Sequence, residues 1–112
     1  MSANTVQLDA VFRALADPTR RAIVERLNRG PAAMTELARP FNMALPSFSQ
    51  HLDVLKSSGL VRSRKSGRVR TFQLTPRPLK AVEGWLAVQH AQWERRLDQL
   101  DTYLADLKEQ KR

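Results

Sequence analysis

The hydrophobic positions of this chain keep helical spacing as far as residue 59, alternate with polar positions between residues 60 and 74, and then return to helical spacing. Apolar residues that recur every three or four positions indicate amphipathic helices, whereas alternation indicates a strand with one buried face. The pattern therefore predicts a mainly α-helical domain that carries a β-hairpin (an α+β fold), followed by one long helix.

Two helices are predicted before residue 31. Thr5 is the expected N-cap of the first helix, whose apolar face is formed by Leu8, Val11, Phe12 and Leu15. Asp17 can cap the next helix, and Pro18 suits its first position, where the missing N–H is not needed. We expect the second helix to stop near Gly30 and to direct these residues inward: Ile23, Val24 and Leu27.

A very short third helix is expected over residues 36–39, with Thr35 as its cap and Leu37 facing the core. Pro40 ends it, and Phe41 and Met43 are expected to pack in the connection.

A fourth helix is predicted over residues 45–58. Its interior stripe is Phe48, Leu52 and Leu55. Its opposite face holds small polar residues, namely Ser47, Gln50, Asp53 and Ser57, with Ser49 at the flank. A polar outward face on a short helix that follows another short helix is typical of a helix-turn-helix, in which the second helix reads DNA. The alternative is an ordinary solvated helix face.

The next segment, residues 61–73, is predicted to be a basic hairpin. Residues 60–64 and 68–74 flank Ser66-Gly67, a turn signal, and Phe72 and Leu74 have the parity for inward packing. Five basic residues crowd this segment without an acidic one: Arg62, Arg64, Lys65, Arg68 and Arg70. Such a cluster favours contact with phosphates or the minor groove over mere solubility. Helix followed by basic hairpin is the arrangement of a winged helix.

The formal charge of the chain is concentrated around this hairpin. The chain has 19 Lys+Arg and 11 Asp+Glu, and residues 54–82 hold eight of the basic residues and no acidic one, so the rest is balanced. A sequence pI near 11.1 favours a polyanionic partner.

From about residue 78 to 108 the apolar positions alternate between spacings of four and three, which is a heptad seam. A helix of that length spans about 45 Å at ~1.5 Å per residue, too long for a small domain to cover. It pairs with a second copy or folds back on its own chain. The predicted dimer interface is Leu8, Trp85, Leu86, His90, Trp93, Leu97, Leu100 and Leu104. The expected organisation is a DNA-binding domain over 5–76, a dimerisation helix over 77–108 and a frayed tail over 109–112.

The absence of cysteine excludes disulfides, thiolate metal sites and cysteine nucleophiles. With two separated histidines and no glycine-rich phosphate loop, no catalytic constellation can be assembled, so we predict that the chain is not an enzyme. No apolar run approaches the roughly 20 residues of a membrane helix, and we expect a cytoplasmic, nucleoid-associated protein without cofactors.

Several segments together resemble the ArsR-type (ArsR/SmtB-like) winged helix-turn-helix regulators. Residues 12–23 (FRALADPTRRAI) are similar to the opening signature of that family, and residues 49–56 (SQHLDVLK) with 58–61 (SGLV) are similar to its recognition helix and entry to the wing. Gly67-Arg68 through Phe72-Gln73-Leu74 matches the return strand of the wing. The resemblance implies a prokaryotic homodimer that binds a near-palindromic operator and represses its own operon until a signal, a small molecule or a protein, releases it.

The chain departs from the metal-sensing members of that family, since it has no cysteine and its only histidines are His51 and His90. His51, at the edge of the apolar stripe, is interpreted as a packing and hydrogen-bonding residue. His90 is interpreted as a polar seam residue, with a metal or pH-sensitive site shared with Glu94 as the alternative. Ala44 stands where the family usually has a capping serine. We therefore expect no metal site.

The sequence predicts a dimeric repressor that binds double-stranded DNA, with Ser47, Ser49 and Gln50 in the major groove and the five basic hairpin residues on phosphates or the flanking minor groove. One alternative is a non-specific architectural DNA-binding protein. The other is a coiled-coil protein-interaction module.

Overall fold

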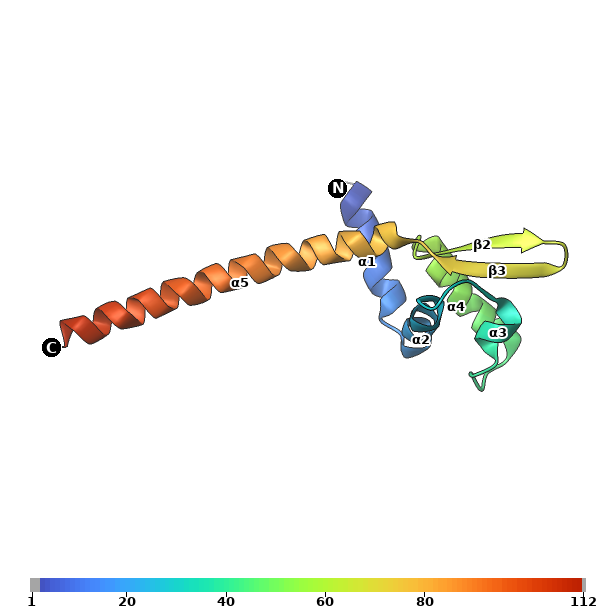
Figure 1. Cartoon of the computed structure of the whole chain (residues 1–112), viewed down its shortest axis with the longest axis horizontal. Helices are drawn as coiled ribbons and strands as arrows, with labels where there is room; N and C mark the ends of the chain where they lie inside the picture. The colour runs from blue at the N-terminus through green and yellow to red at the C-terminus, as the bar shows by residue number, and fades with distance from the viewer. Residues whose placement is uncertain (1–2, 112) are drawn as a thin grey trace. The chain divides into compact units, whose positions relative to one another are not determined.

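The computed structural model describes the backbone of residues 3–111 and the side chains of residues 7–111. The chain divides into two compact units, one up to Val82 and one from Glu83 onward. The described elements are α1 (Ala3–Leu15), α2 (Pro18–Leu27), β1 (Ala32–Ala33), α3 (Met34–Ala38), α4 (Leu45–Ser57), β2 (Val61–Ser66), β3 (Val69–Leu74) and α5 (Pro76–Gln110) (Figure 1). The predicted fold class, a winged helix-turn-helix with a long C-terminal helix, is confirmed.

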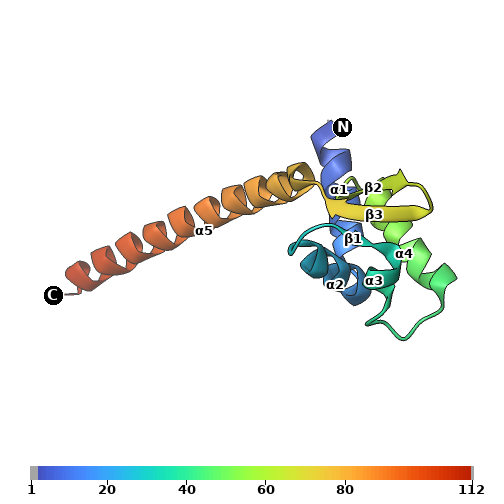
Figure 2. The ribbon, with the colours of Figure 1, turned by 45° about the vertical axis from the view of Figure 1, so that its right-hand side comes forward.

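The core of the first unit lies between α1, α2, α3, α4 and the sheet (Figure 2). The predicted interior stripe of α4 is fully buried, as are Ile23 and Leu37. Phe41 and Met43 pack against this core, and the rings of Phe41 and Phe48 have centroids 5.4 Å apart. Because buried apolar area is the main stabilising contribution in so small a domain, these contacts fix the relative positions of the helices.

The starts of two helices, and the buried face of one of them, differ from the predictions. α1 begins at Ala3, so Thr5 lies inside the helix and is not its cap. α3 begins at Met34 after Ala33, without a side-chain cap, so Thr35 is not a cap either. On α1 the fully buried residues are Val11 and Ala14, whereas Phe12 is 38% exposed. Ala14 is small enough for another helix to approach α1 closely. A prediction based on hydrophobicity alone gives such a small residue too little weight.

The sheet has three antiparallel strands in the order β1-β3-β2. Residues Ala32 and Ala33 of β1 pair with Phe72 and Thr71 of β3, and this short strand was not expected from the sequence. The hairpin closes at the pair Ser66 and Val69, so its two-residue turn is Gly67-Arg68 and not Ser66-Gly67. Gly67 has a φ of +64°, and the left-handed conformation at the first turn position is typical of a type II′ hairpin.

The passage from α4 to β2 depends on Ser58 and Gly59. Ser58 is buried, and its hydroxyl donates to the carbonyl of Leu55 at 2.8 Å and accepts from the N–H of Leu60 at 3.3 Å. Gly59 takes a φ of +83°, which is outside the helical range, so the helix cannot continue through it. Residues with a Cβ rarely adopt this conformation, which is why a glycine is suited to the position. The chain thus leaves α4 and enters the hairpin directly.

α5 runs from Pro76, two residues before the predicted start, to Gln110, the second residue of the segment predicted to fray, whose last residue lies outside the described residues. Within the first unit, Pro78 is buried and Leu79 and Val82 pack against the core. From Glu83 onward the helix forms the second unit, whose described side chains are mostly exposed.

Candidate nucleic-acid interface

The outward face of α4 carries the predicted reading residues. Ser47 and Gln50 are exposed, and Ser49 is half-buried at the flank, as its position on the helical wheel indicates. Asp53, one turn after Gln50, is also exposed. Ala44 occupies the N-cap position and makes no side-chain cap, as expected. The free N–H groups of this first turn carry the positive end of the helix dipole, which suits a phosphate oxygen.

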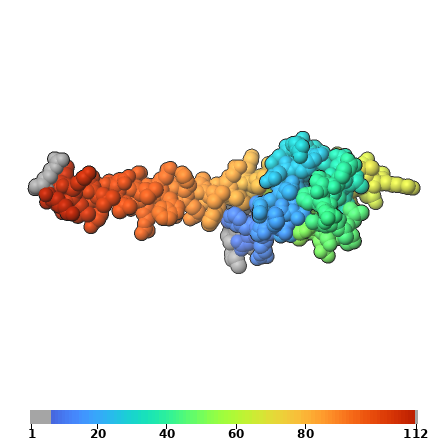
Figure 3. All heavy atoms as spheres, turned by 90° about the horizontal axis from the view of Figure 1, so that it is seen from below, coloured from blue at the N-terminus to red at the C-terminus, as the bar shows by residue number. Residues whose placement is uncertain are grey.

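The basic residues of the hairpin lie on both of its faces. Strand pairing places Arg62 opposite Gln73 and Arg64 opposite Thr71 on one face. Lys65 lies opposite Arg70 on the other face. Nearer the base of the hairpin, this second face carries the buried residues Val61 and Phe72. Arg68 lies in the turn. Figure 3 shows the hairpin end, in yellow, standing out from the helices of its unit.

Lys65 and Arg70 form a direct cross-strand pair of like charges. Such a pair destabilises an antiparallel hairpin by a few tenths of a kcal/mol or more. Within residues 7–111, none of the five basic hairpin residues lies within 4.0 Å of a carboxylate. The hairpin therefore holds a concentration of positive charge that its own chain does not neutralise, which is the electrostatic pattern of a phosphate-binding surface.

Gln73 is a residue that the sequence analysis did not single out. With its amide oxygen turned toward β2, it accepts hydrogen bonds from Nε and Nη2 of Arg62. The two residues are cross-strand partners on the same face, so the amide fixes the guanidinium of Arg62 while leaving its charge exposed. The pairing register of the two strands would have indicated this contact, because the side chains of directly opposite residues lie on the same face and close enough to touch.

Comparison with known proteins places these features in a family. Residues 15–64 match a model described as a helix-turn-helix domain. The chain is 53% identical over 74 residues to the HTH-type transcriptional regulator Rv2034 of Mycobacterium tuberculosis, covering 66% of this chain and 69% of that one. It is 32% identical over 79 residues to the transcriptional repressor SdpR of Bacillus subtilis, covering 70% and 88%.

A crystal structure of the ArsR family transcriptional regulator RHA00566 superposes with a TM-score of 0.78 at 54% identity, covering 84% of this chain and 97% of that one. This chain belongs to the ArsR family. A solution structure from Mycobacterium bovis, described as a homodimeric winged helix-turn-helix DNA-binding domain, is 27% identical with a TM-score of 0.61, covering 85% and 90%. ArsR-family relatives are named as transcriptional regulators and repressors, which agrees with the prediction of a regulator and not an enzyme.

The ArsR-like signature around residues 16–21 has a structural basis. Asp17 is the N-cap of α2, accepting from the N–H of Arg20 at 3.0 Å, and Pro18 occupies the first turn. That hydrogen bond is the main cause that holds the pKa of Asp17 below its ordinary value, against the opposing effect of desolvation. Arg21 donates to the carbonyl of Leu15 at 2.8 Å. The motif therefore joins the end of α1 to the start of α2.

His51 of α4 meets this junction. Its Nδ1 lies 3.2 Å from Nη1 of Arg20 and 3.7 Å from Oδ2 of Asp17. Since a guanidinium only donates, Nδ1 of His51 is the acceptor in the contact with Arg20. The interpretation of His51 as a hydrogen-bonding residue of this ArsR-family domain is supported. Arg20 was quoted only as part of the signature, and its contact with α4 was not foreseen.

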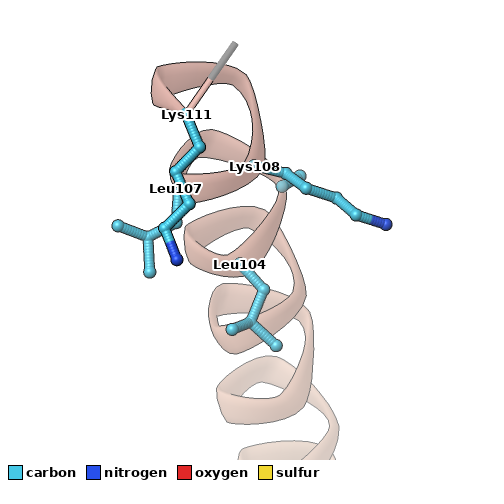
Figure 4. A pocket seen from close by; sticks show the side chains of 5 residues that line it. Leu104, Leu107, Lys108 and Lys111 are labelled. Atoms are coloured by element: carbon cyan, nitrogen blue, oxygen red, sulfur yellow. The ribbon is translucent and has the colours of Figure 1, made fainter.

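The predicted dimer-interface residues of α5 are exposed in this ArsR-family chain. Trp93 is 65% exposed, and the exposed fractions of Leu86 and Leu104 are 51% and 52%. Trp85, Leu97 and Leu100 are exposed to a similar degree, while Leu8 on α1 is half-buried in the first unit. Figure 4 shows Leu104 and Leu107 standing out from the helix near Lys108 and Lys111.

His90 pairs with its own helix. Its Nε2 lies 2.9 Å from Oε1 of Glu94, one turn on, and both side chains are exposed. Over the described residues of this ArsR-family chain, three or more His, Cys, Asp or Glu side chains do not gather in a group able to hold a metal ion. The described helices also include none that is long and apolar enough to cross a membrane.

Proposed function

We propose that the chain is a homodimeric, sequence-specific DNA-binding repressor that acts on a near-palindromic operator, in the simplest case that of its own gene. The observation that carries this proposal is the placement, in one unit, of an exposed polar helix face beside an un-neutralised basic hairpin. α4 packs against β2, so the two surfaces lie next to each other in the same unit of the fold.

In this proposal α4 enters the major groove. Gln50 is the principal base reader because its amide can donate to and accept from adenine N7 and N6 together. Ser47 lies on the same exposed face, and Ser49 at the flank is placed for a phosphate or base edge. Asp53 adds a carboxylate to the face, which favours a cytosine amino group and disfavours indiscriminate phosphate binding.

The hairpin binds the flanking backbone. With Arg62 and Arg64 on one face, Lys65 and Arg70 on the other and Arg68 at the turn, it presents cations in several directions. This distribution suits the minor groove, where phosphates line both walls. Phosphate contact also removes the repulsion between Lys65 and Arg70.

A second copy completes the regulator through the exposed apolar seam of α5. The pairing buries side chains that a single chain leaves half exposed. Two recognition helices related by a twofold axis then read half-sites about 34 Å apart, one turn of DNA. An effector, a small molecule or a protein, releases the repressor by favouring a different arrangement of the two copies.

Fluorescence-anisotropy titration tests the proposal. The probes are a duplex from the region upstream of the gene and a scrambled duplex of equal length, each over a salt series. We expect a preference of several tens-fold for the upstream duplex and an endpoint of one dimer per site. Equal, steeply salt-dependent binding to both would indicate an architectural protein, and no binding at low salt would indicate a protein-interaction module.

The variant Gln50→Ala sharpens this test. It removes a bidentate base contact and is expected to reduce the preference for the upstream duplex by about 10-fold, in line with ~1–3 kcal/mol per base pair, while binding to the scrambled duplex changes little. Asn28→Ala is the matched control, since Asn28 is an exposed amide side chain at the end of α2 and not on α4. A Gln50→Ala protein with undiminished preference would contradict the assignment of α4 as the reading helix.

A further inference from the structure

Within its own unit, α4 is held mostly by contacts that have no direction. Its buried face is the apolar stripe Phe48, Leu52 and Leu55, and its N-cap residue Ala44 makes no side-chain hydrogen bond. At its end, the hydrogen bonds of Ser58 are local. Apolar contacts resist separation but permit small rotations and slides, because their energy depends on area and not on angle.

A hydrogen bond between Arg20 and His51 ties a side chain of α4 to α2, with Asp17, the N-cap of α2, 3.7 Å from the same imidazole nitrogen. His51 directly follows Gln50 in the sequence. A contact that fixes the angular position of His51 around the axis of α4 therefore also fixes the angular position of Gln50. A rotation of α4 by ~10° would move a side-chain tip at the ~5–6 Å outer radius of a helix by about 1 Å. That displacement is enough to spoil a bidentate contact with a base.

Arg20 is held by several hydrogen bonds of its own. Its Nε donates to the carbonyl of Ala14 at 2.7 Å and its Nη2 to the carbonyl of Arg13 at 3.1 Å, both in the last turn of α1. Its backbone N–H is held by Asp17 at 3.0 Å. The positive guanidinium lies at the negative end of the α1 dipole, which adds an attraction to the hydrogen bonds. The remaining nitrogen, Nη1, contacts Nδ1 of His51.

We propose that Arg20 is a positioning residue for base recognition, which fixes the rotation of α4 through His51. This inference rests on the proposed DNA-binding function. The planar guanidinium is needed because one group must reach two carbonyls of α1 and the imidazole at once. A lysine ammonium at the end of a flexible stem cannot hold that geometry.

The test uses the duplex that the wild-type protein selects from a random-sequence library and a scrambled duplex of equal length. His51→Leu removes the acceptor but leaves the other contacts of Arg20 intact. We expect the ratio of the two affinities to fall about 10-fold, with the affinity for the scrambled duplex unchanged. His51→Asn, whose Oδ1 takes the place of Nδ1, is expected to restore the ratio to within about 3-fold of wild type.

Arg20→Lys and the double variant Arg20→Lys/His51→Leu complete the cycle. If Arg20 and His51 act as one unit, the ratio of affinities of the double variant is no lower than that of the poorer single variant. Arg26→Lys is the matched control, since Arg26 lies on the same helix and pairs with Glu36 at 3.5 Å. Its ratio is expected to match wild type. Circular dichroism and thermal unfolding establish that each protein is folded at the assay temperature.

The two proposals fail in different ways. A wild-type protein that enriches no sequence would overturn the proposed function and this inference with it. A selective wild type whose folded His51→Leu variant keeps its full ratio would overturn the inference alone. Loss of selectivity in His51→Leu without recovery in His51→Asn would also overturn it, because the effect would then come from packing and not from the acceptor.

Discussion

The two units of the chain treat their apolar residues in opposite ways. In the unit that ends at Val82, helices and sheet enclose side chains such as Phe48 and Leu55, which are wholly buried. In the unit from Glu83 onward, Trp93 and Leu97 are at least half exposed on a single helix. The first unit covers most of its apolar side chains within one chain, although Phe12, Leu45, Val54 and Val69 stay exposed. The second unit carries an apolar pattern that only a further surface can cover.

This difference separates two kinds of stability. The first unit gains its stability from burial within one chain, so its unfolding should not depend on protein concentration. A lone helix gains little from its backbone hydrogen bonds in water, and the exposed seam of α5 contributes only when a partner covers it. We therefore expect one concentration-independent region and one concentration-dependent region in the same chain.

The largest effect is expected from breaking the seam. The double variant Leu97→Glu/Leu100→Glu removes four leucines from each dimer interface, at about 1.5–3 kcal/mol each, and places carboxylates there. Sedimentation equilibrium should show a monomer where the wild type is a dimer, and affinity for a two-half-site duplex should fall in parallel. Gln99→Glu/Thr102→Glu adds the same charges at polar helix positions and should stay dimeric. A dimeric Leu97→Glu/Leu100→Glu protein would mean that the seam is not the interface.

The next largest effect is expected in the core. Leu52→Ala empties a fully buried site and should lower the free energy of unfolding of the first unit by about 2–5 kcal/mol, measured by urea titration. Leu97→Ala makes the same chemical change on the exposed seam. Below the dimer dissociation constant, its unfolding free energy should match wild type within about 0.5 kcal/mol. Equal losses at the two positions would remove the distinction between the units.

A smaller effect is expected at Asp17. Asp17→Ala removes the N-cap of α2 and should cost about 0.5–2 kcal/mol near neutral pH. Asp17→Asn keeps a capping oxygen but not the charge. Because folding lowers the pKa of Asp17 below 3.8, the stabilisation by its charge is complete well above pH 3.8 and is lost as the pH falls through the folded pKa. The stability difference between wild type and Asp17→Asn, from urea titrations between pH 7 and 2, should therefore shrink in acid. A constant difference would show that the charge contributes nothing.

The smallest effect on the fold is expected at the hairpin turn. Arg68→Ala should leave thermal unfolding unchanged, since Arg68 is exposed and not paired with a carboxylate in the described chain. It should weaken binding to all duplexes and reduce the slope of log K against log salt by about one. Anisotropy titrations over a salt series measure both. An unchanged slope would show that Arg68 does not contact phosphate.

Sequence patterns predicted the parts of the fold that depend on period. The stripe Phe48, Leu52 and Leu55 and the parity of Phe72 are confirmed, because each follows from apolar residues at a fixed spacing. The cap Asp17 is also confirmed, and it followed from residue type and from the proline after it. The small strand Ala32–Ala33 was missed because two alanines carry no alternation, and it exists only through its pairing with β3.

The errors at the boundaries have similar causes. Thr5 and Thr35 were chosen as caps because threonine favours that role, but the helices begin earlier and Ala33 occupies the capping position of α3. Ser66-Gly67 was chosen as the turn because glycine follows serine, whereas pairing of Ser66 with Val69 moves the turn by one residue. Local preference located each feature to within two or three residues, and tertiary pairing decided the rest.

For the candidate site, the exposed positions of Ser47 and Gln50 followed from the helical period. The exposure of the basic hairpin residues followed from their charge, since Lys65 and Arg70 share the strand face of Phe72. The contact of Arg20 with His51 did not follow from the sequence, because the two residues are 31 positions apart and meet only once α2 and α4 have packed. Contacts of that kind leave no periodic pattern in the sequence from which they could be predicted.

The two-residue turn at Gly67-Arg68 has a consequence for how this regulator can change its reach along DNA. A two-residue loop closes on one kind of strand pair, and the two kinds alternate along an antiparallel hairpin. Insertions that keep the turn must therefore add two residues to each strand, which lengthens the arm by about 7 Å. The length of the arm is thus available to evolution and engineering in discrete steps, each of which adds two residue pairs while the base of the hairpin stays in register with the core.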